Sequence, residues 1–101
     1  LNEMDTELFC SSILQARGVK NAVVAEVNEL EKGGKENMSA IVRATSGKRL
    51  LAALQSGDRD GAAFLLGQSI GRIHEVKSVK DIIEDTVKVC EETLRAKLTL
   101  L

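Results

Sequence analysis

Few residues in this sequence could carry chemistry. His74 is the single histidine, and the two cysteines, Cys10 and Cys90, lie far apart without CxxC spacing. One histidine and two distant cysteines cannot supply the four ligands of a closed zinc site. We therefore interpret His74 as a structural residue and the cysteines as reduced thiols. An enzyme built on Cys10 and His74 is an alternative, and it requires those side chains to meet in the fold.

Two local patterns could bind an anion. The stretch GGKENMS starts at Gly33, but it lacks the GxxxxGK[ST] spacing of a phosphate-binding loop and no strand precedes it. We interpret its glycines as a helix stop. Arg17 and Lys20 precede a helix expected to begin near Asn21, where they could meet an anion at the helix N-terminus. Solvated charges on a connection are the alternative that we favour.

The most unusual stretch is an apolar run that is interrupted by polar and small residues. Residues 62–66 are apolar, Gly67-Gln68-Ser69 follows, and Ile70 and Gly71 resume the run. On a helix, two glycines four apart share a face and allow tight helix packing. The other explanation is a surface that lies against a flat ligand, with glycine allowing backbone contact and the Gln68 amide offering hydrogen bonds. Spacing alone does not separate the two.

Composition indicates one soluble globular domain. The chain has 101 residues, 44% of them hydrophobic and 29% charged, with a net charge of −1. Its two aromatic residues are both Phe, which argues against nucleic-acid binding by base stacking. No apolar run approaches the ~20 residues of a membrane span, and no signal peptide is visible. We expect a cytoplasmic protein with no nucleic-acid or membrane partner.

The hydrophobic spacing predicts a mainly α fold: a compact small domain of four to five helices with one N-terminal extended segment. The extended segment, residues 5–12, has no obvious partner strand in the chain. Asn21 is the expected cap of the first helix, and Gly57 is expected to end the third, with Asp58 capping the next. The expected helices are residues 22–32, 37–44, 48–55 and a final one of about twenty residues from Val79.

The final helix has the strongest pattern. Ser78 and Asp81 form a start resembling a capping box. Apolar residues then recur at helical spacing: Val79, Ile82, Ile83, Val87, Cys90, Leu94 and Leu98. Burial of each aliphatic side chain contributes about 1.5–3 kcal/mol, so this stripe is expected to face a core or a partner.

The order of these motifs resembles a known enzyme family. DTEL, then ARGVKNAVVAEVNELEKGG, then SGDRDGAAFLLGQSIGRIHEVKSVKDIIEDTVKVCEETL is similar to the C-terminal part of nitronate monooxygenases, formerly called 2-nitropropane dioxygenases. The related flavin-type enoyl-ACP reductases are similar too. The resemblance covers residues 5–94, and Gly57-Asp58, Gly67-Gln68, Gly71, Ile73 and Glu75 are its most specific part.

The resemblance implies that residues 1–101 form a single helical domain, the C-terminal fragment of a longer flavoenzyme. In such enzymes this domain covers a (β/α)₈-type barrel that binds FMN non-covalently; that barrel is absent here and would be its partner. The family oxidises alkyl nitronates with oxygen, whereas the reductase relatives reduce enoyl thioesters with NAD(P)H. Carried over by position, Gly67 and Gln68 would contact the cofactor, and Leu65 and Leu66 the small-molecule substrate.

The resemblance also limits what this chain does alone. The family's catalytic histidine lies in the barrel, and His74 matches a different position, so we expect no catalytic residue, no metal site and no FMN bound to the fragment. Leu65 stands where some relatives have a hydroxyl residue. We expect the fragment to expose apolar surface around Leu8, Phe9 and residues 64–66, and to self-associate. The alternative is a self-contained helical interaction module without catalysis, with the final helix docking a partner helix.

Overall fold

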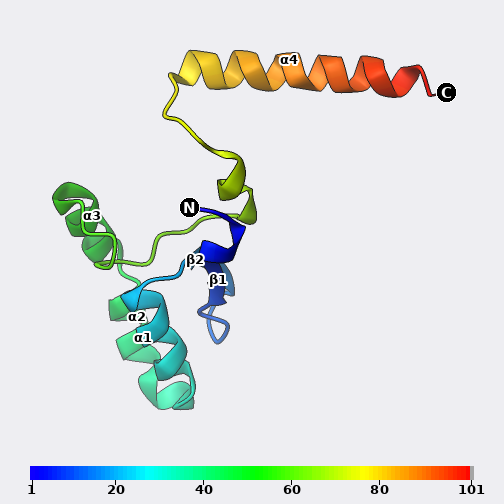
Figure 1. Cartoon of the computed structure of the whole chain (residues 1–101). Helices are drawn as coiled ribbons and strands as arrows, with labels where there is room; N and C mark the ends of the chain where they lie inside the picture. Colours follow the sequence, from blue (N-terminus) through cyan, green and yellow to red (C-terminus); the bar gives the residue numbers. More distant parts are fainter. Residues whose placement is uncertain (101) are drawn as a thin grey trace.

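The computed structural model describes residues 1–100, and most of the regular structure in this range is helical (Figure 1). The mainly α prediction is confirmed. The strands are β1 (Thr6–Phe9) and β2 (Ala16–Val19), and the helices are α1 (Ala22–Glu31), α2 (Met38–Ala44), α3 (Gly47–Ser56) and α4 (Val79–Leu98). Three 3₁₀-helices complete the described elements: η1 (Glu3–Asp5), η2 (Gly34–Asn37) and η3 (Gln68–Arg72).

The N-terminal strand has a partner within the chain. β1 pairs antiparallel with β2, in a register that runs from Thr6 opposite Val19 to Phe9 opposite Ala16. The expectation of a strand without a partner is therefore wrong. Cys10 starts the hairpin connection with a φ of 59°, and its carbonyl accepts the amide of Leu14 at 3.1 Å. This tight turn brings two short strands together that the sequence pattern did not relate.

The helix ends follow the predicted caps. The Asn21 side chain accepts the amide of Val24 at 3.0 Å at the start of α1, as predicted. At the start of α3 the Ser46 hydroxyl accepts the amide of Arg49, a cap that was not predicted from the sequence. Gly57 ends α3 with a φ of 73°, a left-handed conformation that favours glycine. The expected helix after Asp58 is wrong, because the Asp58 carboxylate instead closes a turn by accepting the amide of Asp60 at 3.0 Å.

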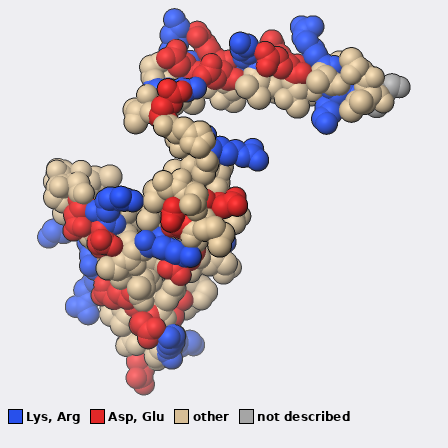
Figure 2. Space-filling model, in the orientation of Figure 1, with Lys and Arg blue, Asp and Glu red and all other residues tan. Residues whose placement is uncertain are grey.

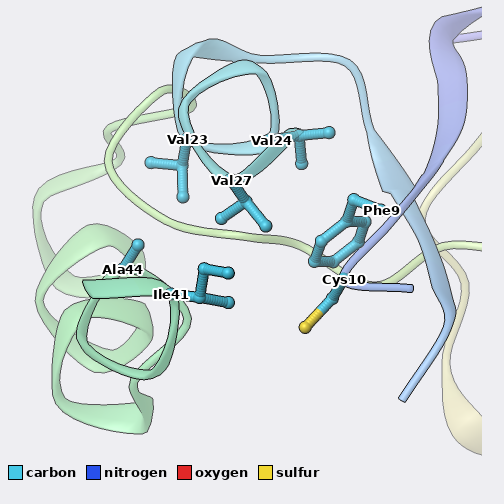
Figure 3. Packing of buried hydrophobic residues seen from close by; sticks show 7 residues of the cluster. All are labelled: Phe9, Cys10, Val23, Val24, Val27, Ile41 and Ala44. Atoms are coloured by element: carbon cyan, nitrogen blue, oxygen red, sulfur yellow. The ribbon is translucent and has the colours of Figure 1, made fainter. Parts of the chain in front are cut away.

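The core lies between α1, α2 and the N-terminal hairpin (Figure 3). Phe9 is 3% exposed, and Figure 3 shows its ring directed toward the α1 valines and Ile41. The expectation that Phe9 lies on an exposed apolar surface is therefore wrong. Because side chains alternate across a strand, the neighbouring Leu8 points outward and is 49% exposed. The core residues are Phe9, Cys10, Val23, Val24, Val27, Ile41 and Ala44.

Helix α4 forms where the sequence predicts it but lies away from the core (Figure 1). The Ser78 hydroxyl accepts the amide of Asp81 at 3.1 Å, as predicted for its cap. The radius of gyration is 18.1 Å, against about 13 Å for a globular chain of this length. The apolar stripe faces no core within residues 1–100, and its residues Ile82 and Leu94 are 51% and 61% exposed. Charged side chains gather along one edge of α4, while the opposite edge is largely uncharged (Figure 2).

An ion pair joins the start of α4 to the connection before it. The Lys77 ammonium lies 2.8 Å from the Asp85 carboxylate and 3.5 Å from that of Glu75. The hydrogen bond with Asp85 and the charge of that carboxylate raise the pKa of Lys77, and the same pair lowers the pKa of Asp85. All three side chains are exposed, so the pair orients the connection without contributing much to stability.

Candidate functional site

The residues predicted to line a cofactor cleft begin in a segment that pairs with the second edge of β2. The Val19 amide donates to the carbonyl of Phe64 at 3.0 Å, and the Leu66 amide donates to the carbonyl of Arg17 at 3.1 Å. These bonds form an antiparallel bridge between Gly18 and Leu65. The apolar run thus extends the sheet, and backbone hydrogen bonds fix the place of the residues that follow.

Gly18 makes this arrangement sterically feasible. A Cβ atom at this position would lie 2.6 Å from the carbonyl oxygen of Phe64 and 2.9 Å from the Phe9 ring. Both contacts are shorter than packed carbon atoms allow. Gly18 belongs to the ARGVKN stretch that carried part of the family resemblance. In this fold it allows β1, β2 and the segment at Phe64 to approach one another closely.

The four predicted site residues do not share one recess. Leu66 is half-buried and lines a recess of about 320 Å³ beside α3, whereas Leu65 is 70% exposed. Gln68 lines a second recess of about 290 Å³, formed with η1 and Gly71. Gly67 is exposed and lies between them. The four residues therefore follow one another along a surface segment and do not enclose a pocket. We call this segment, residues 65–68, the exposed edge.

Gly67 and Gly71 have different surroundings. Gly71 lies in η3, where a Cβ would come 3.3 Å from the backbone nitrogen of Glu3, so this glycine serves close packing. Gly67 precedes η3 in an extended conformation, with a φ of −84° that any residue adopts. A Cβ there would meet only the Ser69 hydroxyl, at 3.6 Å. The two glycines do not share a helix face, so the helix-packing explanation is wrong.

The Gln68 side chain is exposed, and none of the hydrogen bonds among residues 1–100 involves its amide group. An amide has two donors and an acceptor oxygen. Beside it, the backbone at Gly67 is open to a close approach from outside. Gly67 and Gln68 therefore offer exposed backbone and an amide group without a hydrogen-bond partner among residues 1–100.

The N-terminus of α1 is already occupied by the chain's own groups. The Asn21 side-chain oxygen accepts the amide of Val24, and the Asp60 carboxylate accepts the amide of Ala22 at 3.2 Å. The Asn21 amide nitrogen also donates to the carbonyls of Arg59 and Ala62, at 3.0 and 2.8 Å. Asp60 thus takes the place of an external anion. Lys20 is exposed, as expected of a solvated charge, whereas Arg17 is half-buried and its guanidinium donates to the Thr6 hydroxyl at 3.2 Å.

The remaining candidate groups do not form a catalytic site. Cys10 lies in the core, whereas His74 is exposed in the connection to α4, beside a recess lined by Glu75, Lys77 and Asp85. The two side chains that an alternative enzyme would need do not meet. Cys90 is a free, exposed thiol on α4, and Cys10 is a free, buried one. Within residues 1–100, no group of three or more His, Cys, Asp or Glu could hold a metal ion.

Residues 1–100 thus form a small mainly α domain in which the segment around Gly67 is exposed. Among solved structures, FabK from Thermotoga maritima is similar to it, with a TM-score of 0.80 and 26% identity. The match covers all of this chain and 32% of FabK, so the chain spans about a third of that protein's length. This similarity supports a relation between the chain and the family of FabK.

Two other comparisons gave no match. No family model matches the sequence, and no curated protein does. Among the described residues, no helix is both long enough and apolar enough to cross a membrane.

We expect Gly18→Ala to lower the free energy of unfolding by about 1–3 kcal/mol, because the added methyl group overpacks the site between Phe64 and Phe9. Gly47→Ala is the matched control. A Cβ atom at Gly47 would meet no other atom within 4 Å, and its φ is negative, so this change is expected to be neutral or to stabilise by up to about 1 kcal/mol. Urea unfolding followed by circular dichroism measures both, and equal effects would contradict the close approach.

Asn21 variants separate helix capping from loop anchoring. Asn21→Ser keeps an oxygen for the Val24 amide but loses both bonds to the loop carbonyls, while Asn21→Ala loses all three bonds. We expect both variants to be destabilised, and the alanine variant by about 1 kcal/mol more than the serine variant. Thermal or urea unfolding measures the difference. A serine variant as stable as the unchanged chain would show that the loop bonds contribute nothing.

Proposed function

We propose that this chain is the helical, cleft-covering part of an FMN-dependent oxidoreductase of the nitronate monooxygenase-like family. FabK, a flavin-type enoyl-ACP reductase of the 2-nitropropane dioxygenase-like family, supports this proposal through its similarity over the whole chain. The chain spans 32% of FabK, and in this proposal the activity would require a further flavin-binding barrel. The proposed reaction is the oxidation of alkyl nitronates with oxygen.

One observation carries the proposal. Neither the conformation nor the packing of Gly67 within this chain requires glycine, and the adjacent Gln68 amide is free. A glycine that its own domain does not need is explained if a planar ring in a neighbouring domain approaches the backbone at that point. Gln68 would then orient that ring or the substrate by a hydrogen bond.

The residues of this chain would bind and shape the cleft rather than react. When bound, FMN supplies the electron transfer. The exposed Leu65 side chain offers an apolar wall that excludes water from the cleft, and Leu66 continues this wall toward α3. Residues 1–100 contain no glycine-rich phosphate loop, so the FMN phosphate would be held by the barrel.

A second candidate reaction is the reduction of enoyl thioesters with NAD(P)H. The structural similarity to FabK favours it. Leu65 is consistent with it, because the family resemblance implies that some nitronate-oxidising relatives have a hydroxyl residue at that position. In both reactions this chain would have the same task, which is to cover the flavin closely and exclude water. They differ in the substrate and the second redox partner.

A chimera tests the proposed cover directly. The third of FabK that matches this chain is replaced by the chain, and the purified chimera is assayed for bound FMN, for nitronate-dependent oxygen uptake and for enoyl thioester reduction. We expect Gly67→Leu to lower the rate of the active reaction at least tenfold, which is about 1.4 kcal/mol, because the side chain enters the space of the flavin ring. Gly47→Ala, remote from the edge, should leave the rate unchanged.

Nitronate oxidation is detected as oxygen uptake and the second reaction as enoyl thioester reduction, so the assay also distinguishes the two proposed activities. A Gly67→Leu chimera with full FMN content and an unchanged rate would contradict the proposed cover. A chimera that holds FMN but catalyses neither reaction would contradict both proposed activities.

The chain alone is expected not to hold FMN. Gly67 and Gln68 contact only one face of a ring, and the phosphate site lies elsewhere in the proposal. Titration of purified chain with FMN should therefore leave flavin fluorescence unchanged at micromolar protein. Stoichiometric quenching would mean that these residues form a complete flavin site, which contradicts the division of roles proposed here.

A further inference from the structure

We propose that the recess between α3 and the sheet extension binds an aliphatic carboxylate of medium chain length. The recess has a volume of about 320 Å³, within the range of small-molecule sites. It shares Leu66 with the proposed substrate wall but does not include Gly67 or Gln68. Binding to this recess is tested on the flavin-free chain, so its outcome is separate from that of the flavin proposal. Its walls are Leu1, Val19, Ala53, Leu54, Gly57, Asp58, Arg59, Phe64 and Leu66.

The walls come from three elements and are mostly aliphatic or aromatic. Val19 of β2 and the side chains of Phe64 and Leu66 form one side, and Ala53 and Leu54 of α3 form the other. Ala53 is 4% exposed, so its small side chain adds depth, whereas Leu54 is 63% exposed at the rim. A recess with such a lining favours a hydrocarbon chain, since each buried methylene contributes about 0.8 kcal/mol.

The loop that closes one end of the recess is held in place by hydrogen bonds. Asn21 donates to the carbonyls of Arg59 and Ala62, and the Arg49 guanidinium donates to the carbonyl of Gly61 at 2.9 Å. The Asp58 amide donates to the carbonyl of Ala53 at 3.0 Å. These bonds preform the wall, so a ligand would not have to order it on binding.

The charges at the recess select the head group. The Asp58 carboxylate is engaged in its own turn by the amide of Asp60. The Arg59 guanidinium, by contrast, forms no ion pair within residues 1–100. Arg59 is one of the lining residues, and a guanidinium without an ion pair suits a carboxylate, to which it can donate two parallel hydrogen bonds. The complementary ligand therefore has an aliphatic tail and a carboxylate head.

Calorimetric titration of the flavin-free chain, with its amino terminus acetylated, tests this site. The probes are hexanoate, octanoate and decanoate, with octanol and an octanoyl thioester as ligands without the carboxylate. We expect one-to-one binding whose affinity rises about fourfold with each added methylene until the recess is filled. Octanoate should bind about threefold more tightly than octanol or the thioester, and Arg59→Gln should abolish that preference.

Two variants on α3 separate the recess from general apolar adsorption. Leu54→Glu places a carboxylate at the rim and should abolish octanoate binding, whereas Leu51→Glu alters a side chain that is 57% exposed and does not line the recess, and should leave binding unchanged. Circular dichroism checks that both variants fold. Absence of saturable binding, equal effects of the two variants, or equal affinity for octanoate and octanol would each overturn the proposal.

Discussion

The structure depends on a close approach at Gly18, where β2 is paired on both edges. β1 lies on one side, and the Phe64–Leu66 segment lies on the other through two backbone hydrogen bonds. This approach joins the N-terminal hairpin to a segment that follows it by more than forty positions in the chain. A side chain at this position would clash with the carbonyl of Phe64 and with the Phe9 ring. The Phe64–Leu66 segment is positioned by this junction.

The consequences extend to both recesses and to the exposed edge. Since Leu66 is tied to Arg17, it faces α3, and Gly67 and Gln68 follow on the outside of the sheet. Asn21 and Asp60 bind the preceding loop to the start of α1, so both ends of the segment are fixed to the core. The edge is thus held in place by hydrogen bonds while Leu65, Gly67 and Gln68 stay exposed. The apolar stripe of α4 is likewise exposed.

The helices could be predicted from the sequence because their signals are local. Asn21, Gly57 and Ser78 mark helix ends, and apolar spacing marks the faces between them. The β2 strand could not be predicted, because Arg17 and Gly18 interrupt an already short apolar pattern and its pairing depends on distant segments. The burial of Phe9 is hidden for a related reason, because only the pleat decides which of two neighbouring apolar side chains points inward.

Only part of the candidate site could be predicted from the sequence. The break in the apolar run pointed to Gly67 and Gln68, but not to the edge geometry that separates Leu65 from Leu66, since that geometry follows from pairing with β2. Nor could spacing distinguish Gly71, which packs against η1, from Gly67, which packs against nothing in its own domain. The recess beside α3 had no signal in the sequence, because its walls come from three separate elements.

Amide hydrogen exchange, read residue by residue, tests the double pairing of β2 most directly. The amides of Val19 and Leu66 donate to Phe64 and Arg17, so they should exchange slowly, at rates comparable to that of Val27 in α1. Val76 lies in the exposed connection and provides the fast reference. If Val19 and Leu66 exchange as fast as Val76 while Val27 stays protected, the segment is not joined to the sheet, and the edge described here does not exist.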